Sequence, residues 1–397
     1  MTPPFDVERA RAETPGCDKV LHLNNAGASL PPRPVLEAQL DWLQEEAVSG
    51  GYELAERRSA DIERARAEVG ELLGARPAEI ALVENATFAW HQAFWSLPLR
   101  PGDRILTCTT EYASSYLSYL QAQRRRGVIV EVIPDDESGQ VSLTALADRL
   151  EADGAPVGLV GMTHVPTNGG LVNPVVEIGA LCRAAGVPFL LDACQSVGQM
   201  PVDVDAIGCD LLAATGRKFL RGPRGTGFLY VRDPLLEHME PAFLDLLGAT
   251  WVTADRYELR PDARRFENWE SNLAATVGLG HAVAYARGWG LAAIAGRVTA
   301  LAEALRDRLR SLRGVHVHDL GRRRCGIVTF TKDDVDAGDA RAALVAQGMN
   351  VSVSYPSSTL LDAERRALPP VVRASVHYYN DHAELDRFCV AVERLGA

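Results

Sequence analysis

Seven short β-rich runs alternate with helical stretches between residues 80 and 231, and this alternation restricts the possible folds more than any other feature. Several of the runs are apolar without polar alternation, as expected for strands that helices cover on both faces. The pattern predicts a mostly parallel sheet wrapped by helices. The predicted strands are residues 80–83, 104–108, 128–133, 157–162, 187–191, 211–214 and 227–231.

Helices are predicted before this region, and the pattern changes after it. Apolar residues at three- and four-residue spacing predict helices over residues 34–47 and 59–73. A long helix is predicted over residues 291–312, followed by strands near residues 315–318, 326–330, 350–353 and 372–376. We therefore expect a large α/β domain and a smaller α+β domain, with a boundary between residues 260 and 290.

The charge of the chain argues against two classes of partner. The 397 residues carry a formal net charge of -11, which does not favour nucleic acid or an anionic membrane as the principal partner. No segment reaches the ~18 uncharged apolar residues of a membrane span. The first 19 residues have no apolar core of signal-peptide length, so we expect a cytoplasmic protein.

The seven cysteines are scattered, and none form a Cys-x-x-Cys pair. This distribution is typical of small buried apolar side chains in a reducing compartment. We therefore expect neither disulfides nor a metal site.

Two predicted strands are followed by residues that carry chemistry. Asp192 follows the strand over residues 187–191, and Lys218 comes shortly after the strand over residues 211–214. Ligands of open α/β sheets bind beyond the carboxyl ends of the strands, so both side chains can face one ligand. Pyridoxal 5'-phosphate (PLP) needs both groups, because its aldehyde forms a Schiff base with lysine and its ring nitrogen pairs with a carboxylate. The pair therefore predicts a PLP site.

The other parts of this cofactor also have candidate partners. Residues 85–87 follow the strand over residues 80–83 and begin a helical run, which suits a phosphate. Thr215 and Arg217 complete the phosphate cradle, Tyr112 is a candidate for stacking on the ring, and Gln195 for contacting its phenolic oxygen. Arg217 and burial in a cleft are expected to lower the pKa of Lys218 and free its amine for attack.

Each residue alone has a commonplace explanation. An isolated Asp192 or Thr87 is more often a helix cap, an isolated Tyr112 is more often part of the core, and Gly-Arg-Lys is usually surface. The specificity comes from the order: a strand, Asp192 and Gln195, then a second strand, Thr215 and Lys218, then the glycine-rich segment 222–227.

This ordered set resembles the class V aminotransferase-fold PLP enzymes, which include cysteine desulfurases, isopenicillin N epimerase-like proteins and hercynylcysteine sulfoxide lyases. The resemblance extends from residues 23–27 to residues 373–380 and is densest from residue 163 to 231. It implies fold type I, with a mostly parallel seven-stranded sheet in the large domain. It also implies a homodimer with a shared active site. The implied division is an amino-terminal segment (1–30) contributing to the active site and small domain, a large PLP-binding domain (31–275) and a small carboxy-terminal domain (276–397).

The resemblance also implies roles for individual residues. Lys218 bears the Schiff base and Asp192 pairs with the pyridinium. Arg373 matches the arginine that binds the substrate carboxylate, which suits a bidentate guanidinium. Phosphate positions match Ala86, Thr87, Thr215 and Arg217, the ring-stacking position (usually His) matches Tyr112, the phenolic-oxygen contacts match Gln195, Thr167 and Asn168, and further substrate contacts match Asn25, Ala26 and Gly27.

Two departures from the family pattern bear on the reaction. Cysteine desulfurases carry a nucleophilic cysteine on a loop of the small domain, but residues 351–358 contain none, and Cys325 lies too early, on an apolar strand. A persulfide-forming desulfurase is therefore not expected. In the loop over residues 265–272, Glu270 replaces the threonine through which a partner subunit reaches the phosphate, and Ser271, Asn272 or Trp269 are left for that contact.

We expect β-elimination from a bulky cysteine S-conjugate in a specialised biosynthetic pathway. Residues 24–27, 50–52 and 111–112 look most like the lyases of the family, and the Ser- and Tyr-rich loop over residues 354–358 can admit a large polar substituent. Epimerisation, transamination and decarboxylation with oxidative deamination fit the same residues and stay open. A catalytically idle scaffold is the alternative from another class, and the lysine together with its acid argues against it.

Overall fold

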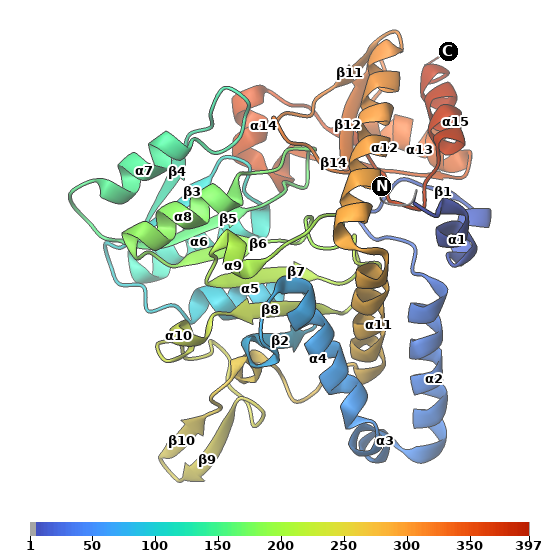
Figure 1. The fold of residues 1–397 in the computed structure, drawn as a ribbon. Coiled ribbons are helices and arrows are strands. Elements are labelled where there is room, and N and C mark those ends of the chain that lie inside the picture. Colours follow the sequence, from blue (N-terminus) through green and yellow to red (C-terminus); the bar gives the residue numbers. More distant parts are fainter. Residues whose placement is uncertain (1–4, 397) are drawn as a thin grey trace.

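The computed structural model describes residues 5–396, and a seven-stranded sheet forms its centre (Figure 1). β8 runs antiparallel to both of its neighbours, and all other neighbouring pairs are parallel. The seven predicted strands are confirmed, with ends that differ by at most two residues. In sheet order the strands are β2 (Ile80–Val83), β8 (Gly227–Val231), β7 (Leu211–Thr215), β6 (Phe189–Asp192), β5 (Val157–Thr163), β3 (Arg104–Cys108) and β4 (Ile129–Ile133).

Helices bury both faces of this sheet, which explains why its strands lack polar alternation. On β6, Leu190 belongs to the core under α5 and α6, whereas Phe189 and Leu191 belong to the core under α4, α8 and α11. Apolar residues are therefore needed at consecutive positions. The helices of this region are α2 (Arg33–Ser49), α3 (Gly51–Arg57), α4 (Ser59–Leu73), α5 (Ala86–Trp95), α6 (Ala113–Arg126), α7 (Leu143–Glu151), α8 (Val175–Ala185), α9 (Val204–Ile207), α10 (Asp233–Leu236) and α11 (Leu273–Trp289).

A four-stranded antiparallel sheet forms the smaller carboxy-terminal part. Its order is β11 (Val315–Val317), β12 (Ile327–Lys332), β15 (Val371–Ser375) and β14 (Ser352–Ser354). The accompanying helices are α12 (Leu291–Ser311), α13 (Ala337–Ala346), α14 (Leu360–Arg366) and α15 (His382–Glu393). α11 packs against α2 and α4, which belong to the same region as the seven-stranded sheet. The domain division at residue 275 stays a prediction.

The predicted strand near residues 350–353 is two strands with different partners. β14 pairs with β15, whereas β13 (Met349–Asn350) pairs in parallel with β1 (Leu21–His22) near the amino terminus. This places the amino-terminal segment, including α1 (Val7–Ala12), beside the carboxy-terminal sheet (Figure 1). The switch of partner depends on a segment more than 300 residues away, which a local pattern cannot show.

A hairpin of β9 (Ala249–Thr253) and β10 (Arg256–Leu259) was not expected from the sequence. It projects from the end of the molecule opposite β11 (Figure 1). Its residues are largely exposed, so they have no buried-strand pattern, although β-branched and aromatic residues flank the two-residue Ala254–Asp255 turn. Within residues 5–396, no helix is long and apolar enough to cross a membrane.

Candidate active site

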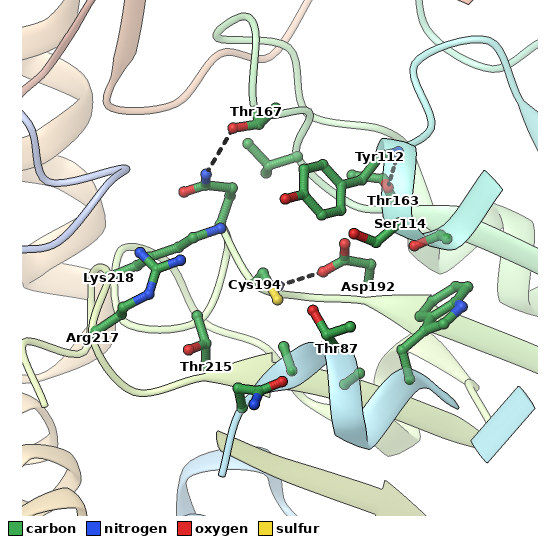
Figure 2. A pocket seen from close by; sticks show the side chains of 17 residues that line it. Thr87, Tyr112, Ser114, Thr163, Thr167, Asp192, Cys194, Thr215, Arg217 and Lys218 are labelled. Carbon is green, nitrogen blue, oxygen red and sulfur yellow. Dashed lines mark hydrogen bonds between the residues drawn. The ribbon is translucent and has the colours of Figure 1, made fainter. Parts of the chain in front are cut away.

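A cavity of about 480 Å³ lies at the carboxyl ends of β5, β6 and β7. This is the edge at which open α/β sheets bind ligands. The structure brings nine of the sequence-predicted site residues together on its walls (Figure 2): Ala86, Thr87, Tyr112, Thr167, Asp192, Gln195, Thr215, Arg217 and Lys218.

Asp192 ends β6 and is 7% exposed. Its Oδ1 accepts a hydrogen bond of 2.9 Å from the backbone N–H of Cys194, which fixes the carboxylate toward the cavity (Figure 2). Lys218 follows β7 through Gly216 and Arg217. Burial lowers the pKa of its amine below the ordinary 10.5, and the charges of Arg217 and Arg373 lower it further, against the raising effect of Cys194 and Asp192. The expected lowering is thus found, and it favours a nucleophilic amine.

The start of α5 forms one wall of the cavity. Asn85 caps this helix by accepting a hydrogen bond of 2.9 Å from the backbone N–H of Phe88. Ala86 and Thr87 are the first helical residues, where backbone N–H groups lack intrahelical partners and favour an anion. Gly227 allows this approach, because a Cβ there would lie 2.8 Å from the carbonyl carbon of Asn85.

Thr167 connects Gln195 with Arg373 of β15. The guanidinium of Arg373 donates to the carbonyl oxygen of Thr167 at 3.0 Å and to its hydroxyl at 2.7 Å. Gln195 Nε2 lies 3.4 Å from the same hydroxyl and 3.2 Å from the carbonyl oxygen of Ala26. Burial, followed by the charge of Arg217, lowers the pKa of Arg373 to about 10, so the group stays a cation at neutral pH. Arg373 therefore reaches the cavity region as an oriented positive charge.

Five predicted residues do not line the cavity, and Arg373, which bonds to the lining residue Thr167, is one of them. Asn168 donates instead to the carbonyl oxygen of Tyr355 and to the hydroxyl of Thr359, each at 3.0 Å. Asn25 is fully buried and bonds to Ser375 and Tyr379. Ala26 and Gly27 contribute through their carbonyl oxygens, which accept from Gln195 and Arg217 respectively.

Several lining residues were missed in the sequence. Thr163 and Ala213 pair with Asp192 on the neighbouring strands, so the strand register could have identified them as lining residues. Trp90 lies one helical turn after Thr87, so the helix period could have identified it as well. Cys194 was assigned to packing. The remaining missed residues are Ser114, Ser115 and Val165.

Glu111 is a buried carboxyl directly behind the cavity and is 3% exposed. It accepts hydrogen bonds from the hydroxyls of Thr163 and Thr107 and from the backbone N–H of Tyr112. Burial raises its pKa to about 8, and the nearby charge of Asp192 acts in the same direction. With this pKa, Glu111 holds a proton at neutral pH.

The side chains fit PLP in chemical type. An amine, a carboxylate, an anion-binding helix start with Arg217 beside it and an aromatic ring surround one space. Gln195 Oε1 is buried in this region without a hydrogen-bond partner among the described residues, as expected for a group that meets a ligand.

Comparison with known proteins agrees with this arrangement. The family model described as "Aminotransferase class-V" matches residues 21–388. Proteins named probable cysteine desulfurase from Methanothermobacter thermautotrophicus and Halobacterium salinarum are each 30% identical to the chain. The matches cover 98% of this chain and 98% and 96% of those proteins.

Solved structures show the same fold. The apo cysteine desulfurase from Thermococcus onnurineus NA1 superposes with a TM-score of 0.92 at 26% identity, covering 99% of this chain and 98% of that one. The cystine C-S lyase C-DES, solved with its product cysteine persulfide, has a TM-score of 0.86 at 24% identity, over 97% of this chain and 100% of that one. The chain therefore belongs to the class V aminotransferase family and is a PLP-dependent enzyme of fold type I that acts on an amino acid.

Proposed function

We propose that the protein is a PLP-dependent C–S lyase that releases the sulfur substituent of a cysteine S-conjugate in a specialised biosynthetic pathway. One observation carries the proposal. The cavity joins Lys218 and Asp192 beside the Arg373–Thr167 pair, while the neighbouring loop around Ser354 has no thiol to accept sulfur.

The residues that would hold the cofactor surround the cavity. Ala86, Thr87, Thr215 and Arg217 would bind its phosphate, and Asp192 its ring nitrogen. PLP, when bound, supplies an electron-accepting ring that stabilises negative charge at the substrate Cα. The remaining partners would be Tyr112 for the ring face and Gln195 and Thr167 for the phenolic oxygen. Asn168 would instead hold the loop at Tyr355, since its amide nitrogen is bonded there.

The protein groups would then divide the chemistry. Arg373 binds the substrate carboxylate and orients the amino acid. The amine of Lys218 removes the proton from Cα, and the sulfur substituent leaves from Cβ with the electron pair of the C–S bond. With one water consumed, the products are a thiol, pyruvate and ammonium, or a sulfenic acid in place of the thiol for a sulfoxide substrate. Asn25 lies behind the site, so Ala26 and Gly27 would bound the substrate space through backbone carbonyls.

The cysteines do not support the reaction of a persulfide-forming desulfurase. Six of them are buried, and Cys194 is largely buried. Burial, followed by the charge of Asp192, raises the pKa of Cys194 well above its ordinary value, so it is a neutral thiol and a poor nucleophile. The names of the relatives therefore do not transfer to this chain's sulfur chemistry.

Product analysis tests the proposal. Purified protein is incubated with S-alkyl cysteines and their sulfoxides, with L-cysteine as the comparison and K218A as the inactive control. We expect equal amounts of pyruvate and thiol from the S-alkyl cysteines, and pyruvate with a sulfenic acid from their sulfoxides. No protein-bound sulfur is expected by mass spectrometry after exposure to L-cysteine. Retention of the Cα hydrogen in the product would instead indicate decarboxylation. Inversion without pyruvate would indicate epimerisation, and amino transfer to a keto acid would indicate transamination.

A cytoplasmic homodimer with a shared active site is part of the proposal. The seven free cysteines suit a reducing compartment. Trp251 on β9 is 80% exposed, and Phe243, Leu246 and Trp269 are also exposed, as expected at a surface that another subunit covers. Light scattering is expected to give twice the chain mass, and W251E to lower it.

A further inference from the structure

The turn that carries Lys218 is hydrogen-bonded to an amino-terminal segment (residues 14–30) and to a carboxy-terminal segment (residues 377–379). Within this lysine turn, defined as residues 216–222, the N–H of Arg221 donates to the carbonyl oxygen of Lys218 at 2.9 Å, and the N–H of Gly222 to that of Gly216 at 2.8 Å. Arg221 has φ +63°, which a non-glycine residue rarely adopts. Such a conformation persists where surrounding contacts impose it.

The side chain of Arg221 makes those contacts. It is 1% exposed, and its Nε donates to the carbonyl oxygen of Leu30 at 2.8 Å. Its Nη1 donates to the hydroxyl of Tyr378 at 2.7 Å and its Nη2 to the hydroxyl of Thr14 at 2.6 Å. The guanidinium also lies 4.6 Å from the ring centre of Tyr379. Three chain segments distant in sequence thus converge on one buried cation.

No described carboxylate lies within ion-pair distance of Arg221. Burying a cation without a carboxylate is costly, and hydrogen bonds and aromatic faces offset that cost only when all of them are in place. The guanidinium therefore requires both the amino-terminal segment and residues 378–379 to be seated.

Further bonds fix the same turn to the same segments. Nε2 of His377 donates to the carbonyl oxygen of Phe219 at 2.9 Å, while its Nδ1 accepts from the N–H of Tyr378 at 2.9 Å. The N–H of Ser29 donates to the carbonyl oxygen of Arg217 at 2.9 Å. The backbone on either side of Lys218 is thereby attached to residues 29 and 377 as well.

We propose that Arg221 is a positioning residue that sets the Lys218 amine by locking the lysine turn to the seated amino- and carboxy-terminal segments. The inference rests on the proposed role of Lys218 in binding PLP. Arg221 itself does not line the cavity. Because Arg221 would act only through the position of Lys218, its substitution should change the rate at which cofactor-free protein binds PLP.

Two substitutions with one matched control test this role. R221M removes the guanidinium, R221K keeps a cation, and R306M removes another fully buried arginine. Arg306 lies in α12 and bonds to Asp319 and Cys325, away from the lysine turn. PLP is added to cofactor-free protein, capture is followed by absorbance, and borohydride reduction locates the labelled lysine by mass spectrometry. Amide hydrogen exchange of residues 216–222 and the melting temperature are measured on the same samples.

We expect R221M to slow capture about 10- to 100-fold and to speed exchange in the lysine turn, since displacing a reacting group by about 1 Å has effects of this size. R221K is expected to recover part of the rate. R306M is expected to lower the melting temperature but to keep wild-type capture and exchange in the turn. Y378F removes one hydrogen-bond acceptor of Arg221 and is expected to slow PLP capture less than R221M. If R221M does not fold, Y378F serves as the test of the positioning role.

Wild-type capture rates in folded R221M, or in Y378F where R221M does not fold, would overturn the inference and leave the proposed function intact. Equal slowing in R306M would also overturn it, because general destabilisation would then explain the effect. Absence of label on Lys218 in wild-type protein would overturn both the inference and the proposed function.

Discussion

Arg373 and Thr167 are joined by two hydrogen bonds, one to the carbonyl oxygen at 3.0 Å and one to the hydroxyl at 2.7 Å. Arg373 lies on β15 of the smaller sheet, and Thr167 lies in the loop after β5 of the large sheet. The pair thus connects the two sheets beside the cavity. If Arg373 binds the substrate carboxylate as proposed, this orientation of the guanidinium before a substrate arrives would lower the entropy cost of binding.

Replacing Arg373 is expected to affect substrate binding more than cofactor binding. In R373K the point charge remains but the planar fork is lost, so we expect kcat/KM to fall about 10- to 100-fold, mainly through KM. Steady-state kinetics with an S-conjugate measure this effect, and the absorbance of bound cofactor should be unchanged. A loss of cofactor without a change in KM would contradict the assignment.

Asp192 is expected to matter through its charge. D192N keeps an oxygen that can accept from the N–H of Cys194 but removes the carboxylate proposed to pair with the cofactor's ring nitrogen. We expect cofactor binding to survive while kcat falls about 100-fold or more, because stabilisation of charge in the transition state is lost. Cofactor content by absorbance and kcat by pyruvate release are the two measurements. An unchanged kcat would remove Asp192 from the mechanism.

Glu111 is expected to make stability pH-dependent. Its pKa is about 8 when folded against an ordinary 4.5, so between these values the folded state holds a proton that the unfolded state has lost. The contribution of Glu111 to the free energy of unfolding is complete below pH 4.5 and is lost as the pH rises through 8. Between these pH values the free energy of unfolding falls by up to about 1.4 kcal/mol per pH unit.

Urea unfolding of wild type and E111Q across this range measures that contribution, because the amide cannot ionise. We expect the stability difference between the two proteins to shift in favour of E111Q as the pH rises. A difference that does not change with pH would mean that Glu111 keeps one protonation state throughout.

The buried pair of Arg66 and Glu267 is expected to stabilise the sheet edge near β2. Arg66 donates to the carboxylate and, at 3.0 Å, to the carbonyl oxygen of Ile80, while the N–H of Leu82 donates to Glu267 at 2.7 Å. R66M leaves a buried carboxylate unpaired and should lower the unfolding free energy by about 3–5 kcal/mol. The unfolding free energy should fall less in the double variant R66M/E267L than in R66M alone. A larger fall in the double variant would show that the unpaired carboxylate does not cause the destabilisation of R66M.

The sequence predicted those parts of the molecule that local pattern controls. Strands such as Phe189–Asp192 are apolar at consecutive positions because both faces are covered, and Asp192 and Lys218 fall at strand ends that topology brings together. The orientation of Asn168 was not predictable, because it depends on Tyr355 in a distant loop. The proton on Glu111 depends on burial, which its sequence neighbours do not reveal.

The pairing of β1 with β13 has a consequence for how the protein is made. His22 and Asn350 face each other across this ladder although 328 residues separate them. While a ribosome is still producing the chain, the first strand has no partner and its backbone edge is open to association with other molecules. Pairing of this strand must therefore await synthesis of residues 349–350, and chaperones that shield residues 21–22 until then would be expected to raise the yield.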